Sequence, residues 1–571
     1  MEKEKNFFDL IIIGAGFAGM YALYKAKQHN LSVSVFEKAS GVGGTWYWNR
    51  YPGARCDVES MQYSYQFSKK LEQEWEWKEQ YATQAEILKY AEHVAERYNL
   101  KPSIKFNETI ISAHFDEKSK IWKINNRKGK EYTSKFCIMA TGCLSSTYTP
   151  FLKGASSFEG EIYHTGNWPH QTIDFTGKTV GIIGTGSSAI QSIPVIAEQA
   201  EHLYVFQRTP HYTVPARNRF LIYDKKQNGS KKRRAEGFDT DLTVEEIKTD
   251  YDNLRKKAKK MYAAMAFNLN KKSALEVPEL ERKKEYENRW NKGGVPFIGA
   301  FIDLNLNREA NETAAEFVRN KIRQTVKDPL VAEKLVPNYT IGCKRLAVDT
   351  NYYETYNKAN VTLVDIKNDP IEKIFSRGII TKKEKYLFDS LIYATGFDAM
   401  TGALLKIDIK GTQGIKLAKK WSKGPRSFLG LAIKGFPNLF TITGPGSPSV
   451  FTNMITSIEQ HVDWIFDCLD YLKAHNIEII EATEKSENDW VKHNQEIAKP
   501  HIRSSCSSWY MGSNIEGKPE IFMPYVGGFP AYVKKCEEIS KSGYKGFGKH
   551  IMTGNQFIDN GNKGSVFIEG E

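Results

Sequence analysis

Two segments of this 571-residue chain have the spacing of a dinucleotide-binding fingerprint, and this repetition constrains the fold more than any other feature. In the first segment Gly14, Gly16 and Gly19 follow an apolar strand pattern and begin a stretch with helical periodicity. Glycines in such a unit allow a tight turn and let the backbone approach a pyrophosphate, which the N–H groups at the helix start bind. The next strand pattern ends at Glu37, where a carboxylate accepts the 2′-hydroxyl of a ribose.

The second segment repeats this pattern but ends in the opposite charge. A strand pattern at residues 179–183 leads into its glycines, and its residues are Gly184, Gly186, Ser187, Ser188, Arg208 and Thr209. An arginine after the second strand suits a 2′-phosphate, which favours NADPH. A single GxGxxG motif is weak evidence, but two in strand–turn–helix context predict FAD at the acidic site and NADPH at the basic one.

The fingerprints predict an α/β chain with two Rossmann-like domains and a helical insert. Two apolar strands end in Ala-Thr-Gly, at residues 140–142 and 394–396, and resemble the crossing points between the FAD and NADPH domains of two-nucleotide flavoproteins. We therefore expect a discontinuous division of the chain. The expected parts are an FAD-binding domain at residues 1–150 and 389–571, an NADPH-binding domain at 151–220 and 336–388, and a helical insert at 221–335.

The second part of the predicted FAD domain contains a long amphipathic helix. Its apolar residues Ile455, Ile458, Val462, Ile465, Leu469 and Leu472 repeat at alternating spacings of three and four, which predicts core packing. The turn Gly444-Pro445-Gly446 precedes this helix. Two explanations of its glycines stay open: a helix start that favours an anionic reduced flavin, and ordinary turn chemistry.

Composition excludes several other classes of protein. No apolar stretch approaches the ~20 residues that span a bilayer, and the amino end leads directly into the first strand pattern, so we expect a cytoplasmic protein. The seven cysteines are odd in number and scattered, without a CxxC pair. We therefore expect reduced thiols, with no disulfide framework, no dithiol redox centre and no metal site.

The net charge of +13 raises the question of nucleic-acid binding. Its densest source is residues 225–289, where Lys and Arg alternate with Asp and Glu in a helix-rich pattern. This pattern is typical of a solvated helical face, so we expect no nucleic-acid partner. A modest positive field also attracts the phosphates of NADPH.

Residues 158–169 form the most specific motif in the chain. Phe158, Gly160, His164, Trp168 and Pro169 match FxGxxxHxxxW[PD] at every fixed position. From about Phe8 to about Phe547 the chain resembles the type I Baeyer–Villiger monooxygenases, particularly their phenylacetone monooxygenase branch. Related flavin monooxygenases that oxidise nitrogen and sulfur usually lack the closing Trp-Pro or Trp-Asp, so the motif favours carbonyl oxidation. For His164, a linking role between domains and a catalytic role both stay open.

The resemblance also implies roles for residues that spacing alone would leave as ordinary structural charges. In this family, the arginine that matches Arg345 lies over the flavin, and the aspartate that matches Asp57 orients this arginine. The residue that matches Lys344 makes a second contact to the NADPH phosphate. Trp509 matches a tryptophan in a mobile cover that contacts the nicotinamide nucleotide, and Trp46 is expected to bind cofactor. A fixed guanidinium stabilises both anions of the expected reaction, the deprotonated flavin peroxide and the tetrahedral adduct, and it keeps its own proton.

The resulting hypothesis is an FAD-dependent enzyme that uses NADPH and O2 to convert ketones to esters or lactones through a C4a-peroxyflavin, with sulfoxidation as a side activity. Val58, Val450 and Phe451 are expected to line the substrate pocket and suggest a small apolar ketone. The alternatives are a flavin monooxygenase acting on nitrogen or sulfur and a non-catalytic flavoprotein that senses NADPH. The sequence assigns no oligomeric state and no role to the tail beyond Lys549.

Overall fold

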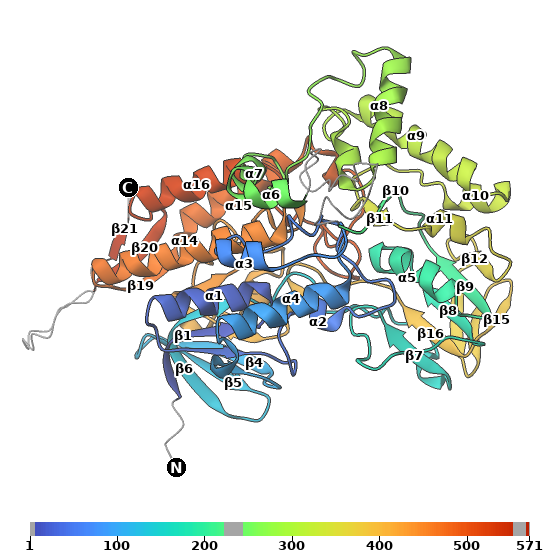
Figure 1. Ribbon diagram of the computed structural model, residues 1–571. Helices are drawn as coiled ribbons and strands as arrows, with labels where there is room; N and C mark the ends of the chain where they lie inside the picture. The colour runs from blue at the N-terminus through green and yellow to red at the C-terminus, as the bar shows by residue number, and fades with distance from the viewer. Residues whose placement is uncertain (1–5, 222–243, 552–566, 570–571) are drawn as a thin grey trace, which may run out of the picture.

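The protein has two structural halves, each built around one large sheet (Figure 1). The half called the first below contains a mixed sheet of eight strands. The computed structural model describes residues 6–221, 244–551 and 567–569. The strand order is β17 (Asp408–Lys410), β4 (Ile110–Asp116), β5 (Ile121–Asn126), β6 (Glu131–Met139), β1 (Phe7–Ile13), β2 (Val33–Phe36) and β3 (Ile104–Lys105), with β18 (Leu439–Thr441) paired to β6. The chain leaves this sheet after β6 and returns with β17 and β18, so the unit is discontinuous as expected.

A second sheet of five parallel strands forms the other half, on the right of Figure 1. Its order is β12 (Val361–Asp365), β9 (His202–Gln207), β8 (Thr179–Ile183), β16 (Ser390–Tyr393) and β7 (Glu161–His164). The predicted domain boundary at residue 389 is therefore wrong. Because β16 pairs with both β7 and β8, the second unit extends at least to Tyr393.

The two nucleotide fingerprints fold in the same way. Gly14 has φ +105°, and a Cβ there would lie 2.5 Å from the carbonyl oxygen of Ala140. Gly184 has φ +111°, and its Cβ would lie 2.5 Å from the carbonyl oxygen of Ala394. Both alanines begin an Ala-Thr-Gly triplet, so each triplet packs against the first glycine of its fingerprint. Only glycine tolerates both the conformation and this approach.

The second sheet packs against a small sheet on one face and against helices on the other, whereas both faces of the first sheet are covered by helices. Those nearest the fingerprints are α1 (Phe17–Gln28), α2 (Thr45–Trp48), α3 (Lys69–Glu74), α4 (Gln84–Arg97) and α5 (Ser187–Ala197). Later helices are α11 (Tyr352–Thr355), α12 (Gly402–Leu405), α13 (Leu417–Lys420), α14 (Met454–Ala474), α15 (Glu484–Ala498) and α16 (Phe529–Lys541). The described residues also form three small sheets: β10 (Thr213–Pro215) with β11 (Ala347–Asp349); β13 (Ile371–Phe375), β14 (Gly378–Thr381) and β15 (Lys385–Leu387); and β19 (Ile477–Ala482), β20 (Phe547–Ile551) and β21 (Phe567–Glu569).

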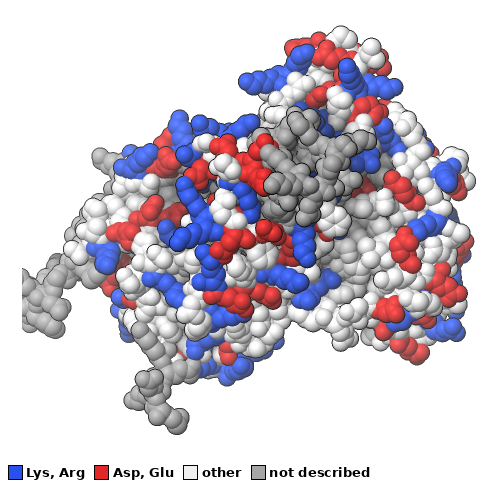
Figure 2. All heavy atoms as spheres, in the orientation of Figure 1, with Lys and Arg blue, Asp and Glu red and all other residues white. Residues whose placement is uncertain are grey.

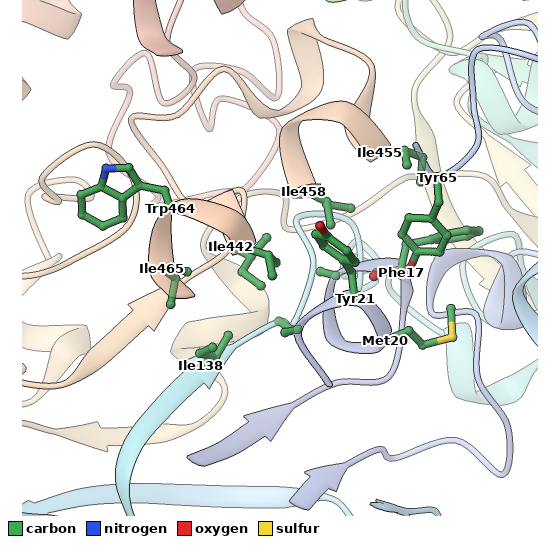
Figure 3. Packing of buried hydrophobic residues seen from close by; sticks show 14 of the residues in the cluster. Phe17, Met20, Tyr21, Tyr65, Ile138, Ile442, Ile455, Ile458, Trp464 and Ile465 are labelled. Atoms are coloured by element: carbon green, nitrogen blue, oxygen red, sulfur yellow. Dashed lines mark hydrogen bonds between the residues drawn. The ribbon is translucent and has the colours of Figure 1, made fainter. Parts of the chain in front are cut away.

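The amphipathic helix α14 packs into the core as predicted (Figure 3). All six residues of its apolar stripe are buried, and Ile455 and Ile458 lie close to Phe17 and Tyr21 of α1. The side chain of Asn453 caps the helix by accepting a hydrogen bond from the Ile455 N–H at 3.1 Å. α14 thus fixes the position of the first fingerprint helix.

The helical insert is divided between the two halves. Its helices are α6 (Val244–Thr249), α7 (Tyr251–Lys259), α8 (Glu279–Lys292), α9 (Arg308–Thr325) and α10 (Pro329–Leu335). α6 and α7 pack on the first half, where buried Arg255 pairs with Glu72, Nε to Oε1 3.1 Å. Only α8–α10 pack on the second, so the insert is not wholly part of the NADPH unit. Residues 222–243 of the predicted insert lie outside the described residues.

Basic and acidic side chains are interspersed on the molecular face that Figure 2 shows. Charges of both signs on one face are typical of a solvated surface. Among the described residues, none of the helices has the length and apolar character needed to cross a bilayer.

The contact between α1 and the first glycine turn generates a test of the fold. A Cβ at Gly19 would lie 1.8 Å from the carbonyl oxygen of Gly14, whereas a Cβ at Gly186 would meet nothing within 4 Å. We expect Gly19→Ala to lower the free energy of unfolding by about 1–3 kcal/mol, because backbone must move. Gly186→Ala is the matched control in urea titrations followed by circular dichroism, and equal midpoints for the two variants would contradict this packing.

Candidate active site

A cavity of about 1400 Å³ lies where the two halves meet, and both fingerprints line it. Its walls include most residues selected from the sequence: Gly14, Gly16, Glu37, Trp46, Asp57, Val58, Gly184, Gly186, Ser187, Ser188, Arg208, Thr209, Lys344, Arg345, Val450 and Trp509. Gly19 instead packs behind the wall, against Gly14. The carboxyl ends of parallel strands are where α/β proteins bind nucleotides.

Glu37 sits at the end of β2 with its carboxylate against the first glycine turn. Its two oxygens accept hydrogen bonds from the Ala15 N–H at 2.7 Å and the Ala39 N–H at 2.8 Å. The side chain is 5% exposed, and burial raises its pKa although both bonds act in the opposite direction. This held carboxylate and the glycine turn fit an adenosine ribose and pyrophosphate, as FAD requires. Trp46 is fixed nearby by a 3.1 Å hydrogen bond from its indole N–H to the Tyr63 hydroxyl.

Arg208 and Lys344 form a pair of like charges on the cavity wall. Burial lowers the pKa of Lys344, and the neighbouring Arg208 lowers it further. The ammonium lies 4.9 Å from the centre of the Tyr339 ring. Neither cation pairs with a carboxylate in the described part of the chain, so the arrangement fits a dianionic phosphate group.

Asp57 and Arg345 form a bidentate ion pair that faces the cavity. Nε donates to Oδ2 and NH2 donates to Oδ1, both at 2.9 Å. NH1 donates to the Val450 carbonyl oxygen at 3.2 Å. Asp57 is the largest cause of a raised pKa for Arg345, so the guanidinium stays charged. The predicted proximity of these two residues is thus present in the structure.

His211 is a cavity residue that sequence reasoning missed. Its ring Nε2 lies 2.7 Å from the Arg345 carbonyl oxygen and donates to it in the neutral tautomer. Burial lowers the pKa of His211 to about 4. A lone histidine three residues after Arg208 carries no sequence signal, because only the fold brings it to the backbone of Arg345.

The motif at residues 158–169 joins the two halves rather than lining the cavity with its fixed residues. Nδ1 of His164 accepts from the Gly166 N–H at 3.0 Å, while Nε2 lies 3.1 Å from the Tyr148 carbonyl oxygen. This pattern needs a neutral ring, in accord with the lowered pKa that burial gives His164. The Thr395 hydroxyl donates to the same carbonyl at 2.5 Å. The geometry favours a linking role for His164.

The other fixed positions of the motif are structural contacts. Trp168 donates its backbone N–H to the Trp48 carbonyl oxygen at 3.2 Å, which connects it to the first half. Phe158 is buried near Phe388, with ring centres 5.6 Å apart. A Cβ at Gly160 would lie 2.2 Å from the Asp389 carbonyl oxygen. These fixed positions of the motif therefore correspond to packing requirements.

The segment around Trp509 closes one side of the cavity. Trp509 packs on Tyr510 with ring centres 4.3 Å apart. Downstream, the Asn514 side chain donates to the Phe397 carbonyl oxygen at 2.8 Å, and Lys518 pairs with Asp398 at 2.6 Å. The segment is thus anchored beyond Trp509 to the connection after the second Ala-Thr-Gly triplet.

A disulfide joins Cys343 to Cys506, and the expectation that all thiols are reduced is wrong. The two cysteines are 163 residues apart, so no local spacing indicates their pairing. One precedes Lys344 and the other lies three residues before Trp509, and the fold brings these segments together at the cavity. The other five cysteines are buried free thiols.

The expected substrate-pocket residues divide into two groups. Val58 and Val450 line the cavity. Phe451 is buried beside Val450, with its ring centre 4.7 Å from that of Tyr510 and 4.1 Å from the Arg503 guanidinium. That Phe451 lines the substrate pocket stays a prediction.

Two nucleotide cradles around one cavity, with a partly buried arginine–carboxylate pair, define a two-nucleotide flavoprotein oxidoreductase. A family model described as pyridine nucleotide-disulphide oxidoreductase matches residues 11–257. A Baeyer–Villiger monooxygenase of Pseudooceanicola batsensis is 39% identical, with 94% of this chain and 95% of that protein covered. A phenazine N-monooxygenase of Lysobacter antibioticus is 37% identical over 96% of this chain and 98% of its own length.

Solved structures agree with these relatives. An oxidised steroid monooxygenase bound to NADP is 47% identical, covers 95% of this chain and 99% of its own, and superimposes with a TM-score of 0.88. A complex of OTEMO with FAD and NADP is 37% identical over 95% of this chain and 99% of that one, with a TM-score of 0.88. The chain belongs to the type I Baeyer–Villiger monooxygenases, and it is a flavin monooxygenase that uses FAD and NADPH.

The environment of His211 predicts a pH dependence of stability. Its folded pKa of about 4 lies below the unfolded value of ~6.5, so the unfolded state takes up this proton first. The resulting stability is complete above pH 6.5 and is lost as the pH falls towards 4, by up to about 3 kcal/mol. His211→Gln keeps an N–H donor for Arg345 and removes this titration. We expect the variant to lose less stability than the parent between pH 7.5 and 5 in denaturant titrations, and parallel pH profiles would contradict the assignment.

Proposed function

We propose that this enzyme inserts an oxygen atom next to the carbonyl group of small apolar ketones, giving esters or lactones. The observation that carries the proposal is the Asp57–Arg345 pair, which presents a permanently charged guanidinium to a cavity bordered by both nucleotide cradles. Oxygen insertion places negative charge on the carbonyl oxygen of the substrate, and a fixed cation stabilises that charge. Val58 and Val450 provide an apolar wall beside this cation.

The residues of the cavity divide the work between binding and chemistry. Bound NADPH supplies the hydride and bound FAD supplies the oxygen activation. In our assignment, the first half holds FAD through Gly14, Gly16 and Glu37, and the second half, including β16, holds NADPH through Gly184 and Gly186. Arg208 and Lys344 bind the 2′-phosphate. Trp509 covers the nicotinamide nucleotide and helps exclude water, which prevents loss of the activated oxygen.

Asp57 is essential to this proposal because it sets the geometry of Arg345. Two parallel hydrogen bonds fix the plane of the guanidinium, while NH1 is held by the Val450 carbonyl oxygen. A bidentate pair of this kind orients an arginine more strictly than a single contact does. The backbone of the same residue is held by His211. We assign Arg345 a catalytic role and Asp57 a positioning role.

Heteroatom oxidation is the second candidate function, and one relative supports it directly. The phenazine N-monooxygenase matches this chain over nearly its whole length, so family membership alone does not select carbon as the site of oxidation. We favour carbonyl oxidation as the main reaction, with sulfoxidation as a side activity. Family membership favours an enzyme over the NADPH-sensing alternative. A cytoplasmic location is also part of the proposal, and cell fractionation tests it.

Product mass tests the reaction. The purified FAD-loaded protein is incubated with NADPH, air and a simple aryl ketone, with an aryl methyl sulfide and a tertiary amine in parallel. We expect an ester one oxygen heavier than the ketone as the main product. A sulfoxide or N-oxide without any ester would overturn the ketone assignment in favour of heteroatom oxidation.

Arg345→Ala separates cofactor reduction from substrate oxidation. We expect anaerobic reduction of the flavin by NADPH to survive within about tenfold, while ester formation falls at least 100-fold because the developing charge loses about 3 kcal/mol of stabilisation. Stopped-flow absorbance measures the first step and product mass the second. Unchanged ester yield would remove Arg345 from the mechanism.

Removal of either phosphate-binding cation tests the NADPH assignment. We expect Arg208→Ala and Lys344→Ala each to raise the KM for NADPH by about 10- to 100-fold, because each variant loses one charge-assisted contact. The KM for NADH should stay within about twofold, since NADH has no 2′-phosphate. Steady-state kinetics with both nucleotides provide the comparison. Equal effects on NADH and NADPH would place these cations away from the 2′-phosphate.

A further inference from the structure

The helix that begins at the second nucleotide fingerprint is hydrogen-bonded to the segment that carries Asp57. Gln191 lies on α5, three residues after Ser188, and its side chain lines the cavity. Its Oε1 accepts from the Tyr51 hydroxyl at 2.8 Å and from the Arg55 N–H at 3.4 Å. Its Nε2 donates to the Arg55 carbonyl oxygen at 3.1 Å. One amide thus pairs with both ends of the loop at residues 51–55.

Backbone packing supports this connection. Gly53 has φ +78°, and a Cβ there would lie 2.2 Å from the carbonyl oxygen of Gln191 and 3.1 Å from Cγ2 of Val195. At Gly53 the backbone of the loop therefore lies directly on the backbone of α5. Because the two backbones are in direct contact, a displacement of α5 also displaces the loop.

The opposite side of the same loop is fixed to the first half of the protein. NH1 of Arg55 donates to Glu79 at 2.9 Å and to the Tyr81 carbonyl oxygen at 3.1 Å. The Gln84 N–H donates to the Ala54 carbonyl oxygen at 2.8 Å. The loop is thus held between the two halves, and Asp57 follows Arg55 by two residues. Any change in how α5 docks reaches the Asp57–Arg345 pair through a short, hydrogen-bonded path.

We propose that Gln191 is a positioning residue that couples nucleotide binding at the second fingerprint to the geometry of the Asp57–Arg345 pair. The inference rests on the proposed role of that pair. Gln191 acts through Tyr51 and Arg55 rather than through the phosphates of the nucleotide. Through this coupling, oxygen transfer to the substrate depends on correct docking of the second half, which binds NADPH.

Gln191→Met tests the proposal, since methionine keeps the length of the side chain but forms none of the three hydrogen bonds. The matched control is Gln199→Met, because Gln199 is exposed beyond the end of α5 and does not line the cavity. Among the described residues, its side chain accepts only the Phe175 N–H, at 3.4 Å. We expect the ester formed per NADPH consumed to fall at least fivefold in Gln191→Met, with hydrogen peroxide making up the difference. The dissociation constant for NADP⁺ should change less than twofold in both variants.

Hydrogen–deuterium exchange gives a second readout that needs no ketone turnover. In the parent and in Gln199→Met, NADP⁺ should slow exchange in the peptide covering residues 51–57, and in Gln191→Met this protection should be lost. If the parent makes no ester while this difference persists, the proposed reaction fails and the coupling stands. Retained protection, or weaker NADP⁺ binding with unchanged ester yield, overturns the positioning role.

A double substitution checks that the effect passes through the loop. Tyr51→Phe removes the hydroxyl donor to the same Gln191 oxygen. If both residues belong to one connection, Tyr51→Phe in the Gln191→Met background should change the ester yield per NADPH by less than twofold, although it lowers the yield in the parent. Losses that multiply would show independent effects and overturn the proposed path.

Discussion

The ion pair between Asp57 and Arg345 is the interaction on which the arrangement of the cavity depends. It connects residues 288 apart in the sequence, on two separate loops. A charged guanidinium in a partly buried site needs a carboxylate, because an unpaired charge there costs several kcal/mol. Satisfying that requirement places a cation between the two nucleotide cradles. The chemistry and the stability of the site therefore depend on the same pair.

Directional polar contacts connect the two halves of the protein. His164 approaches the Tyr148 carbonyl oxygen, Trp168 donates to Trp48, and Gln191 bonds to Tyr51. The disulfide between Cys343 and Cys506 adds a covalent connection near the cover. Such contacts depend on direction, so they specify the relative placement of the halves more sharply than apolar area does. This placement decides which groups face the cavity.

Local patterns in the sequence predicted the elements well but not their boundaries. Both fingerprints were recognisable because Gly14 and Gly184 must adopt a conformation that other residues resist. The stripe of α14 was visible because burial repeats with the helix period. In contrast, β16 was assigned to the wrong unit, since an apolar strand followed by Ala-Thr-Gly looks the same in either sheet. A single sequence contains no local pattern that indicates which distant strands pair.

The sequence by itself determined that two nucleotides bind, which charge marks each site, and, through its motif, the family. These properties reside in short segments whose backbone conformation and charge are set locally. Only the tertiary structure decided that Arg345 meets Asp57, that His211 holds the backbone of that arginine, and that Gln191 reaches the loop of Tyr51. It also showed that Cys343 and Cys506 are paired. The physical reason is that each of these contacts joins segments separated by more than a hundred residues or depends on the direction of one side chain, and both are fixed only when the two halves pack together.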